Sequence, residues 1–366
     1  MFPASQSFPP ASRQTGSRPG GPPRIVAIGG GTGLPNVLRG LRPLLFPGGG
    51  RQQDTTPRDQ LVAVVATSDD GGSSGRLRAE FNMVPPGDIR NCLAALSDNH
   101  ALIADIFQYR FDTGEGLNGH AIGNLVLTAL ADVMNDFPRA VEIAARLVGA
   151  RGTVLPATRS MVTLIAEMED GRTLSGESAI NAAGGRIQKV SLIPDRPECL
   201  PEVCAAIRDA DVIVVGPGSL YTSILPPLLV PDVAAAVLQS AATRIFVANL
   251  MTEPGETDDY SGLDEVLVIE RHLEAHLFDG VIYNTSPVPD ALAGIYAALN
   301  ARPVSTGTFE ISAFEGLGIR PIGVPLVSEH PVGKIRHHPD RLAAAIMALA
   351  QGKFGARRAR AEAGGL

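Results

Sequence analysis

Residues 24–36 read RIVAIGGGTGLPN, and this stretch decides the fold of the chain. The apolar run Ile25–Ile28 is typical of a strand that is buried on both faces of a parallel sheet. A glycine-rich turn follows, and Pro35 then stands where the first turn of a helix tolerates proline. Such a turn lets backbone N–H groups approach a phosphate closely, although a purely structural turn is the alternative. The stretch therefore predicts an α/β fold whose first loop binds an anion.

Further apolar runs of the same kind recur along the chain and alternate with helical patterns. They are Leu61–Ala66, Val212–Val215, Ile245–Asn249 and Val281–Tyr283. Because each run is short, continuous and followed by polar or glycine residues, the sequence predicts a doubly wound, mostly parallel sheet. Residues 100–149 are predicted to form a helical subregion.

The remaining segments complete a predicted single α/β domain over residues 24–350. Residues 152–193 alternate in hydropathy around the turn signal Asp170-Gly171, which is typical of a small antiparallel β insertion. Residues 1–23 are rich in proline and lack periodicity, so we expect a disordered leader. Residues 351–366 are expected to form a flexible basic tail.

The composition excludes several classes of protein. The chain has 366 residues, 45% of them hydrophobic and 19% charged, which is typical of a globular protein with a sizeable core. No apolar run approaches the roughly 18 residues that a membrane span needs, and no secretory signal is recognisable. The three cysteines fit no metal or disulfide spacing, and the formal charge of −7 argues against nucleic acid. We therefore expect a cytoplasmic protein without a membrane span or a nucleic-acid partner.

Polar residues gather where the predicted strands end, which is where open α/β sheets bind ligands. Asp69 and Asp70 follow the run Leu61–Ala66, and one of them could hold a ribose hydroxyl or a magnesium ion. Arg90 stands at the start of a predicted helix and suits a phosphate. The neighbouring Asp88 could simply cap that helix.

Two later segments extend this predicted site. His120 and Asn124 lie one helical turn apart at the start of the most apolar helix, facing either a buried cavity or the core. Residues 216–223, GPGSLYTS, form a second glycine loop at a strand end, with hydroxyls that can reach anionic oxygens. Two such loops suggest a ligand with two anionic groups.

Other kinds of site fit the sequence less well. The dinucleotide fingerprint lacks its third glycine and the later acidic residue, and no Walker motif occurs, so an NAD site and a Walker-type hydrolase are disfavoured. Residues 71–75, GGSSG, match the nucleophile elbow of hydrolases, but no partner histidine is indicated. His272 and His276 have no third ligand, which favours an exposed helix face over zinc.

Six segments in order resemble the gluconeogenesis factor (YvcK) family within the CofD-like superfamily. They are GGGTG (29–33), SDDGGSSGRLR (68–78), PPGDIRNCL (85–93), GHAIGN (119–124), GPGSLYTSILP (216–226) and NLMTEPGETD (249–258). The likeness covers about residues 24–350 and implies a Rossmann-like core in a cytoplasmic protein. It also implies binding of UDP-sugars such as UDP-N-acetylglucosamine, and a role that links gluconeogenic carbon flux to peptidoglycan synthesis and cell shape.

The resemblance also implies a ligand shell. Its members are Gly30, Gly31, Thr32, Gly33, Asp69, Asp70, Ser73, Ser74, Arg90, Asn91, His120, Asn124, Gly218 and Ser219, with Arg336 in a C-terminal basic stretch as a further candidate. Asp69 and Asp70 are the candidate ligands for Mg²⁺. The expected partners are a UDP-sugar, proteins of cell-wall synthesis or its regulation, and further copies of the chain. Glu253 and Pro227 depart from the glutamine and asparagine expected in relatives, which bears on the choice of sugar.

Two functions from different classes remain open. One is a regulator that responds to a UDP-sugar, and the other is a magnesium-dependent transferase similar to the phospholactate transferase of the same superfamily. The sequence offers phosphate-binding groups but, apart from His120 and the aspartates, no arranged acid, base or nucleophile. We therefore favour the regulator.

Overall fold

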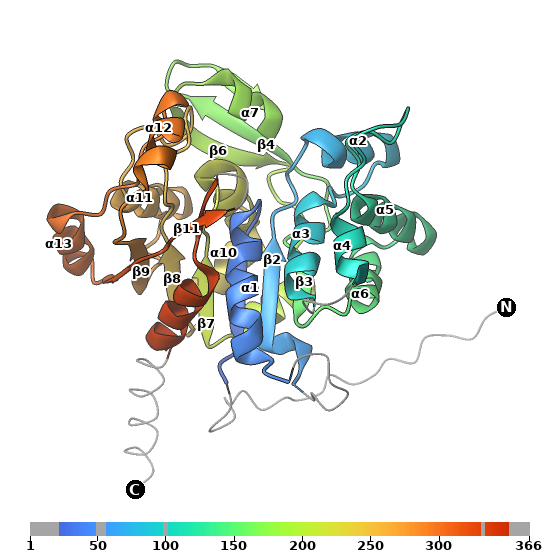
Figure 1. Cartoon of the computed structure of the whole chain (residues 1–366), viewed down its shortest axis with the longest axis horizontal. Coiled ribbons are helices and arrows are strands. Elements are labelled where there is room, and N and C mark those ends of the chain that lie inside the picture. Colours follow the sequence, from blue (N-terminus) through green and yellow to red (C-terminus); the bar gives the residue numbers. More distant parts are fainter. Residues whose placement is uncertain (1–21, 49–55, 98–101, 331–333, 351–366) are drawn as a thin grey trace, which may run out of the picture.

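A seven-stranded parallel sheet forms the centre of the computed structural model, which describes residues 22–48, 56–97, 102–330 and 334–350 (Figure 1). Its strand order is β10-β9-β8-β7-β1-β2-β3. The strands are β1 Ile25–Gly29, β2 Leu61–Val65, β3 Thr153–Pro156, β7 Val212–Val215, β8 Thr243–Val247, β9 Gly280–Asn284 and β10 Arg320–Val324. The predicted doubly wound, Rossmann-like sheet is thus confirmed. The predicted tail and all but residues 22 and 23 of the predicted leader lie outside the described residues.

Two hydrophobic cores lie on opposite faces of the sheet, because successive side chains of a strand point to opposite sides. In β1, Ile25 and Ala27 enter the first core, and Val26 and Ile28 enter the second. This is why the strands read as continuous apolar runs.

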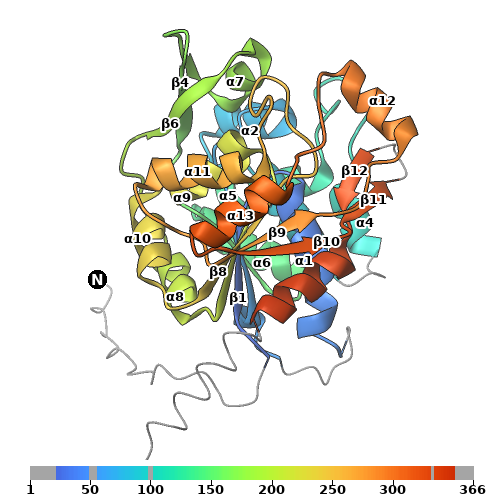
Figure 2. The same ribbon diagram turned by 90° about the vertical axis from the view of Figure 1, so that its left-hand side faces the viewer.

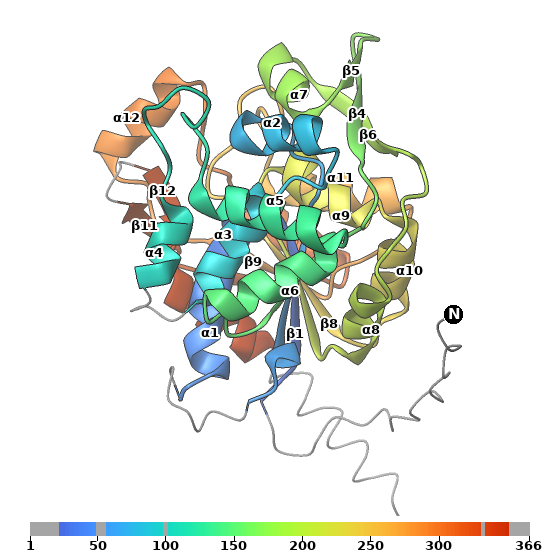
Figure 3. The ribbon, with the colours of Figure 1, turned by 90° about the vertical axis from the view of Figure 1, so that its right-hand side faces the viewer.

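Helices cover both faces of the sheet (Figures 1 and 3). The first core is closed by α1 Gly33–Leu45, α3 Gly87–Leu96, α4 Leu102–Gln108, α5 Ile122–Met134, α6 Phe137–Leu147, α12 Asp290–Ala298 and the helix formed by residues 339–350. The second core is closed by α8 Pro201–Asp209, the π-helical turn η2 Leu220–Ile224, α9 Leu225–Leu228, α10 Pro231–Gln239, α11 Gly262–Leu273 and α13 Thr308–Gly316. The helical subregion predicted over residues 100–149 corresponds to α4, α5 and α6.

A small antiparallel sheet stands over the carboxyl ends of the central strands (Figure 2). It consists of β4 Thr163–Met168, β5 Thr173–Ser175 and β6 Ile187–Ile193 in the order β5-β4-β6, with α7 Glu177–Ala183 between β5 and β6. Within the predicted insertion of residues 152–193, the first strand β3 instead pairs with β2 in the central sheet. It does so because Val154 is buried in the first core.

The remaining short elements complete the described part of the fold. They are η1 Arg58–Gln60, α2 Gly72–Phe81 and the antiparallel pair β11 Val327–His330 and β12 Lys334–His337. From β1 the chain proceeds to β2 and β3 on one side, and from β7 to β8, β9 and β10 on the other. The strand order therefore reverses between β1 and β7, and open α/β sheets bind ligands at this switch point.

Within the described part of the chain, no single helix is both long and apolar enough to cross a membrane. The segments Leu220–Leu228 and Pro231–Gln239 meet those criteria only when taken together, and they are bent by 77° relative to each other.

Candidate functional site

The glycine loops that follow β1 and β7 are in direct contact at the switch point. A Cβ atom at Gly33 would lie 2.1 Å from the backbone oxygen of Pro217, a distance that atoms cannot adopt. Gly31 and Gly216 have φ angles of +61° and +76°, which side chains rarely tolerate. Glycine at these positions therefore allows the two loops to approach each other and to turn at the strand ends.

Asp88 supports the first glycine loop from below. Its Oδ2 accepts a hydrogen bond from the N–H of Gly31 at 2.6 Å and would lie 2.7 Å from a Cβ at Gly30. Burial raises the pKa of Asp88 to about 6, and the charge of Asp69 adds to this effect. Asp88 forms no capping bond to α3, so the structure contradicts the interpretation of this residue as a helix cap.

A cavity of about 440 Å³ opens between the two glycine loops and the loop after β8; we call it the loop cavity. Its polar wall includes Gly31, Thr32, Gly33, Gly218, Ser219, Asn249, Glu253 and Arg336. Its apolar wall includes Leu250, Met251, Tyr296, Leu299 and Ile335. The N-terminus of α1 faces this space with no acidic residue in its first turn and no side-chain cap. The helix dipole and the free N–H groups of that turn favour an anion here.

A second cavity of about 440 Å³ adjoins the first; we call it the arginine cavity. Thr32, Asn36, Arg336 and His337 line both cavities, so the two form one continuous depression. His337, the residue after Arg336, holds this strand in place. Its backbone carbonyl accepts a hydrogen bond from the Asn36 amide, and its side-chain Nε2 donates to the Ala248 carbonyl at 3.0 Å. Burial lowers the pKa of His337 to about 4, so its imidazole is neutral.

Asn249 and Glu265 fix the second glycine loop. The Asn249 side chain pairs with the backbone of Gly218, donating to its carbonyl at 2.8 Å and accepting from its N–H at 3.1 Å. Glu265 of α11 accepts from both the side chain and the N–H of Asn249. The Ser219 hydroxyl in the same loop donates to Glu256 at 2.6 Å. That hydroxyl is therefore engaged within the protein rather than poised as a nucleophile.

Four of the predicted ligand residues form a buried polar network beside the loops. Ser73 Oγ lies 2.9 Å from Nδ1 of His120 and accepts from the Asn124 amide at 3.0 Å. Asn124 in turn accepts from Arg90 Nη1 at 3.1 Å. Burial lowers the pKa of His120, which favours the neutral imidazole as the acceptor of the Ser73 hydroxyl. The GGSSG segment thus has a histidine partner that the sequence did not indicate.

Asp69 and Asp70 bond to different parts of the molecule. Asp69 Oδ1 accepts from the N–H of Gly71 at 2.9 Å, and Asp70 Oδ1 accepts from the N–H of Ser178 in α7 at 2.8 Å. Among the described residues, no group of three or more His, Cys, Asp or Glu side chains has metal-binding geometry. The two aspartates therefore do not form a metal site by themselves, and Mg²⁺ would need phosphate oxygens and water as its other ligands.

Glu177, in α7 of the antiparallel insertion, lies close to Asp69 and Asp70, and the sequence did not predict this residue as part of the site. Burial, together with the charges of Asp69, Asp88, Glu256 and Asp70, raises the pKa of Glu177 to about 9. This carboxyl is therefore protonated at neutral pH and can donate a hydrogen bond. Only the packing of α7 against the Asp69–Asp70 loop reveals this role.

The structure divides the predicted ligand residues into two groups. The residues that line a cavity are Gly31, Thr32, Gly33, Asn91, Gly218, Ser219 and Arg336. Those that line neither of these two cavities are Gly30, Asp69, Asp70, Ser73, Ser74, Arg90, His120 and Asn124. Arg39, Asn249 and Tyr296 line a cavity but were not predicted. The helical spacing of Thr32, Asn36 and Arg39 is the one signal that could have identified Arg39.

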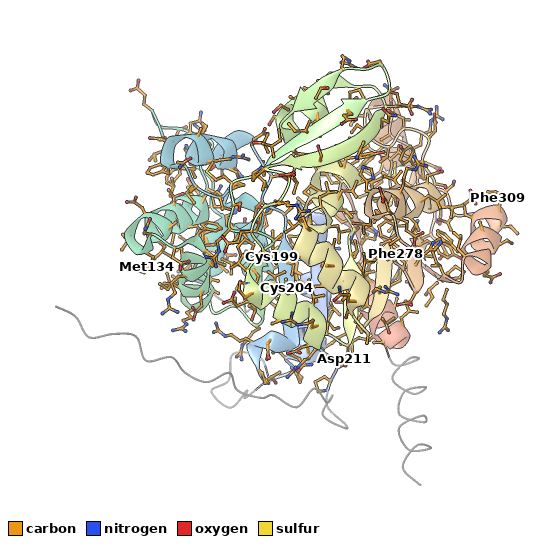
Figure 4. The ribbon with its side chains drawn as sticks, turned by 180° about the vertical axis from the view of Figure 1, so that it is seen from behind. Met134, Cys199, Cys204, Asp211, Phe278 and Phe309 are labelled. Atoms are coloured by element: carbon orange, nitrogen blue, oxygen red, sulfur yellow. The ribbon has the colours of Figure 1, made fainter. Side chains whose placement is uncertain are left out.

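His272, Cys199 and Cys204 have local partners. His272 accepts from the N–H of Val190 in β6 at 3.1 Å, so it joins α11 to the antiparallel sheet. The Sγ atoms of Cys199 and Cys204 lie 3.1 Å apart at the start of α8 (Figure 4). All three cysteines are free, and the proximity of these two thiols was not predictable from their spacing of five residues, which is not a common motif.

Comparison with known proteins agrees with this architecture. Residues 25–327 match the family model described as 2-phospho-L-lactate transferase CofD. The chain is 43% identical over 327 residues to the gluconeogenesis factor of Bacillus subtilis, covering 89% of this chain and 98% of that one. It is 41% identical over 323 residues to the gluconeogenesis factor of Halalkalibacterium halodurans, covering 88% and 95%.

A solved structure shows the same fold. A crystal structure of a UPF0052 family member from Bacillus halodurans superimposes with a TM-score of 0.80 at 41% identity, covering 88% of this chain and 98% of that chain. The family match, the two relatives and this fold agree with the resemblance that the six sequence segments indicated. The chain therefore belongs to the CofD family and, within it, to the gluconeogenesis factors.

Proposed function

We propose that this protein binds a UDP-sugar, such as UDP-N-acetylglucosamine, and acts as a regulator that links gluconeogenic carbon flux to peptidoglycan synthesis and cell shape. The observation that carries the proposal is the convergence of two glycine loops, from β1 and β7, on one cavity at the switch point of the sheet. Membership of the gluconeogenesis factors supports the physiological part of the proposal. Proteins of cell-wall synthesis or its regulation, and further copies of the chain, are the proposed partners.

The loop cavity suits a nucleoside diphosphate in both its polar and apolar parts. The positive end of α1 and the guanidinium of Arg336 offer charge to the phosphates. The side chains of Tyr296 and Leu299 offer an apolar surface for the flat nucleobase. The first loop lacks the third glycine of the dinucleotide fingerprint, which argues for a uridine nucleotide over NAD.

A ligand titration tests this function. UDP-N-acetylglucosamine at about 100 times its Kd should raise the free energy of unfolding by about 2.7 kcal/mol, and NAD, NADP and ATP should have smaller effects. Arg336→Gln should weaken UDP-N-acetylglucosamine binding at least about tenfold, because a charge-assisted hydrogen bond contributes about 1.5–3 kcal/mol. Arg208→Gln, on the surface of α8, is the matched control. A larger stabilisation by NAD than by every uridine nucleotide would refute the proposal.

One observation favours a second function, a magnesium-dependent transferase. Asp69 and Asp88 act on each other electrostatically beside the first glycine loop, and charged carboxylates next to phosphates are the usual setting for Mg²⁺. The description of the family model also names a transferase. In this case, with Mg²⁺ and an acceptor hydroxyl supplied by cell extract, the protein should transfer the sugar with release of UDP, or the sugar phosphate with release of UMP, and Asp69→Asn should abolish the release. If mass spectrometry instead finds the nucleotide sugar intact after incubation with the protein, Mg²⁺ and cell extract, the result supports the regulator.

A further inference from the structure

Two arginines that are distant in the sequence line the arginine cavity. Arg39 comes from α1, and Arg336 comes from β12. Thr32 and Asn36 lie on the same face of α1 as Arg39, at spacings of four and three residues. Asn91, Gln108 and Ser328 complete a wall of neutral hydrogen-bonding groups.

Among the residues that the structure describes, no carboxylate lines the cavity beside these charges. Of the described residues, none that lines the cavity is acidic, and neither Arg39 nor Arg336 forms an ion pair within 4.0 Å. Burial lowers the pKa of Arg39; the nearby Cys92 opposes this effect, and the cations Arg336 and Arg42 add to it. Glu253 feels the charge of Arg336, but it lines the loop cavity instead.

Placing like charges together without a counter-ion costs free energy, and an anionic ligand group recovers it. The neighbouring imidazole of His337 is neutral at physiological pH and cannot supply further charge. The cavity therefore has the shape and the donors of a subsite for an anionic oxygen group, with Arg39 as the residue that distinguishes it from the loop cavity.

We propose that the arginine cavity binds a second anionic group of the ligand, a carboxylate or phosphate carried by the sugar of a nucleotide sugar. This inference rests on the proposed function, because it assumes that the diphosphate occupies the loop cavity. With the diphosphate at the N-terminus of α1, the sugar enters the arginine cavity past Arg336, which lines both spaces. Arg39 then favours nucleotide sugars with an acidic sugar over those with a neutral one, among them UDP-N-acetylglucosamine.

Isothermal titration with UDP-glucuronic acid and UDP-glucose tests the proposal, because the two differ only in the carboxylate on the sugar. We expect the wild-type protein to bind UDP-glucuronic acid at least about tenfold more tightly. Arg39→Gln should reduce this ratio towards one by weakening the acidic ligand more than the neutral one. Arg42→Gln is the matched control on the same helix, since Arg42 donates to the Ala95 carbonyl at 3.3 Å and lines neither cavity; it should keep the wild-type ratio.

Two outcomes of this titration overturn the subsite. One is equal or weaker binding of UDP-glucuronic acid by the wild-type protein, and the other is an equal ratio in wild type and Arg39→Gln. If neither nucleotide sugar binds, the proposed function fails, and inorganic phosphate then tests the cavity alone. Phosphate binding by the wild-type protein that Arg39→Gln abolishes would support the subsite, and identical or absent binding in both proteins would refute it. A UDP-glucose titration in the presence of phosphate separates a free anion from one carried by the sugar.

Discussion

Replacing Gly33 by alanine should separate the two glycine loops on which the candidate site depends. The added Cβ would lie 2.1 Å from the backbone oxygen of Pro217, 2.6 Å from its carbonyl carbon and 3.1 Å from the nitrogen of Gly218. Ordinary contacts need about 3.5 Å, so one loop must move by roughly 1 Å or more. Neither neighbour is the end of a flexible side chain, and overpacking of this kind costs about 1–3 kcal/mol. Because alanine is otherwise the better helix former, a loss of stability reports the clash itself.

Urea unfolding of Gly33→Ala beside Gly294→Ala provides the measurement. A Cβ at Gly294, inside α12, would meet nothing within 4 Å, so this control should match or exceed the wild-type stability. Gly33→Ala should lose about 1–3 kcal/mol and should also bind UDP-N-acetylglucosamine at least about tenfold more weakly, because its first loop no longer presents its N–H groups in place. A Gly33→Ala protein with wild-type stability would show that the loops are not packed as described, and the reasoning would fail.

Three further predictions concern the supports of the site. Burial raises the pKa of Asp88 to about 6, so the native state holds a proton that the unfolded state releases near pH 4, and the free energy of unfolding falls as pH rises between these values. When unfolding is compared at pH 4 and pH 7.5, Asp88→Asn should lack up to about 3 kcal/mol of this decline, and an unchanged pH dependence would contradict the assignment. Asn249→Ala removes the side-chain donor to the buried carboxyl of Glu265 and both bonds to the Gly218 backbone, so urea unfolding should show a loss of about 1–3 kcal/mol, whereas a neutral effect would argue against this support. Mild oxidation by diamide should join Cys199 to Cys204 in a disulfide, with a mass loss of two hydrogens that Cys204→Ser prevents and Cys92→Ser does not. No mass change in the wild-type protein would mean that the two thiols do not meet.

The sequence alone was sufficient to predict the architecture and the two glycine loops that line the loop cavity. Short apolar runs alternate with helical patterns, and these patterns arise from local periodicity, which a single sequence displays directly. The loops after β1 and β7 were identifiable because glycine permits conformations and approaches that other residues do not, as the φ of +61° at Gly31 shows. Both predictions depend on residues close together in the chain.

Which distant residues meet was decided only by the tertiary structure. Asp88 supports Gly31 across 57 residues, and Arg39 shares a cavity with Arg336 from the other end of the chain. Strand β3 likewise joined the central sheet rather than the insertion, because Val154 packs into the first core. Local propensity cannot specify such contacts, since they depend on how helices and strands pack against one sheet. The sequence by itself therefore determined the elements and the loops that carry the polar residues, and packing decided which of those residues face a cavity and which support others from behind.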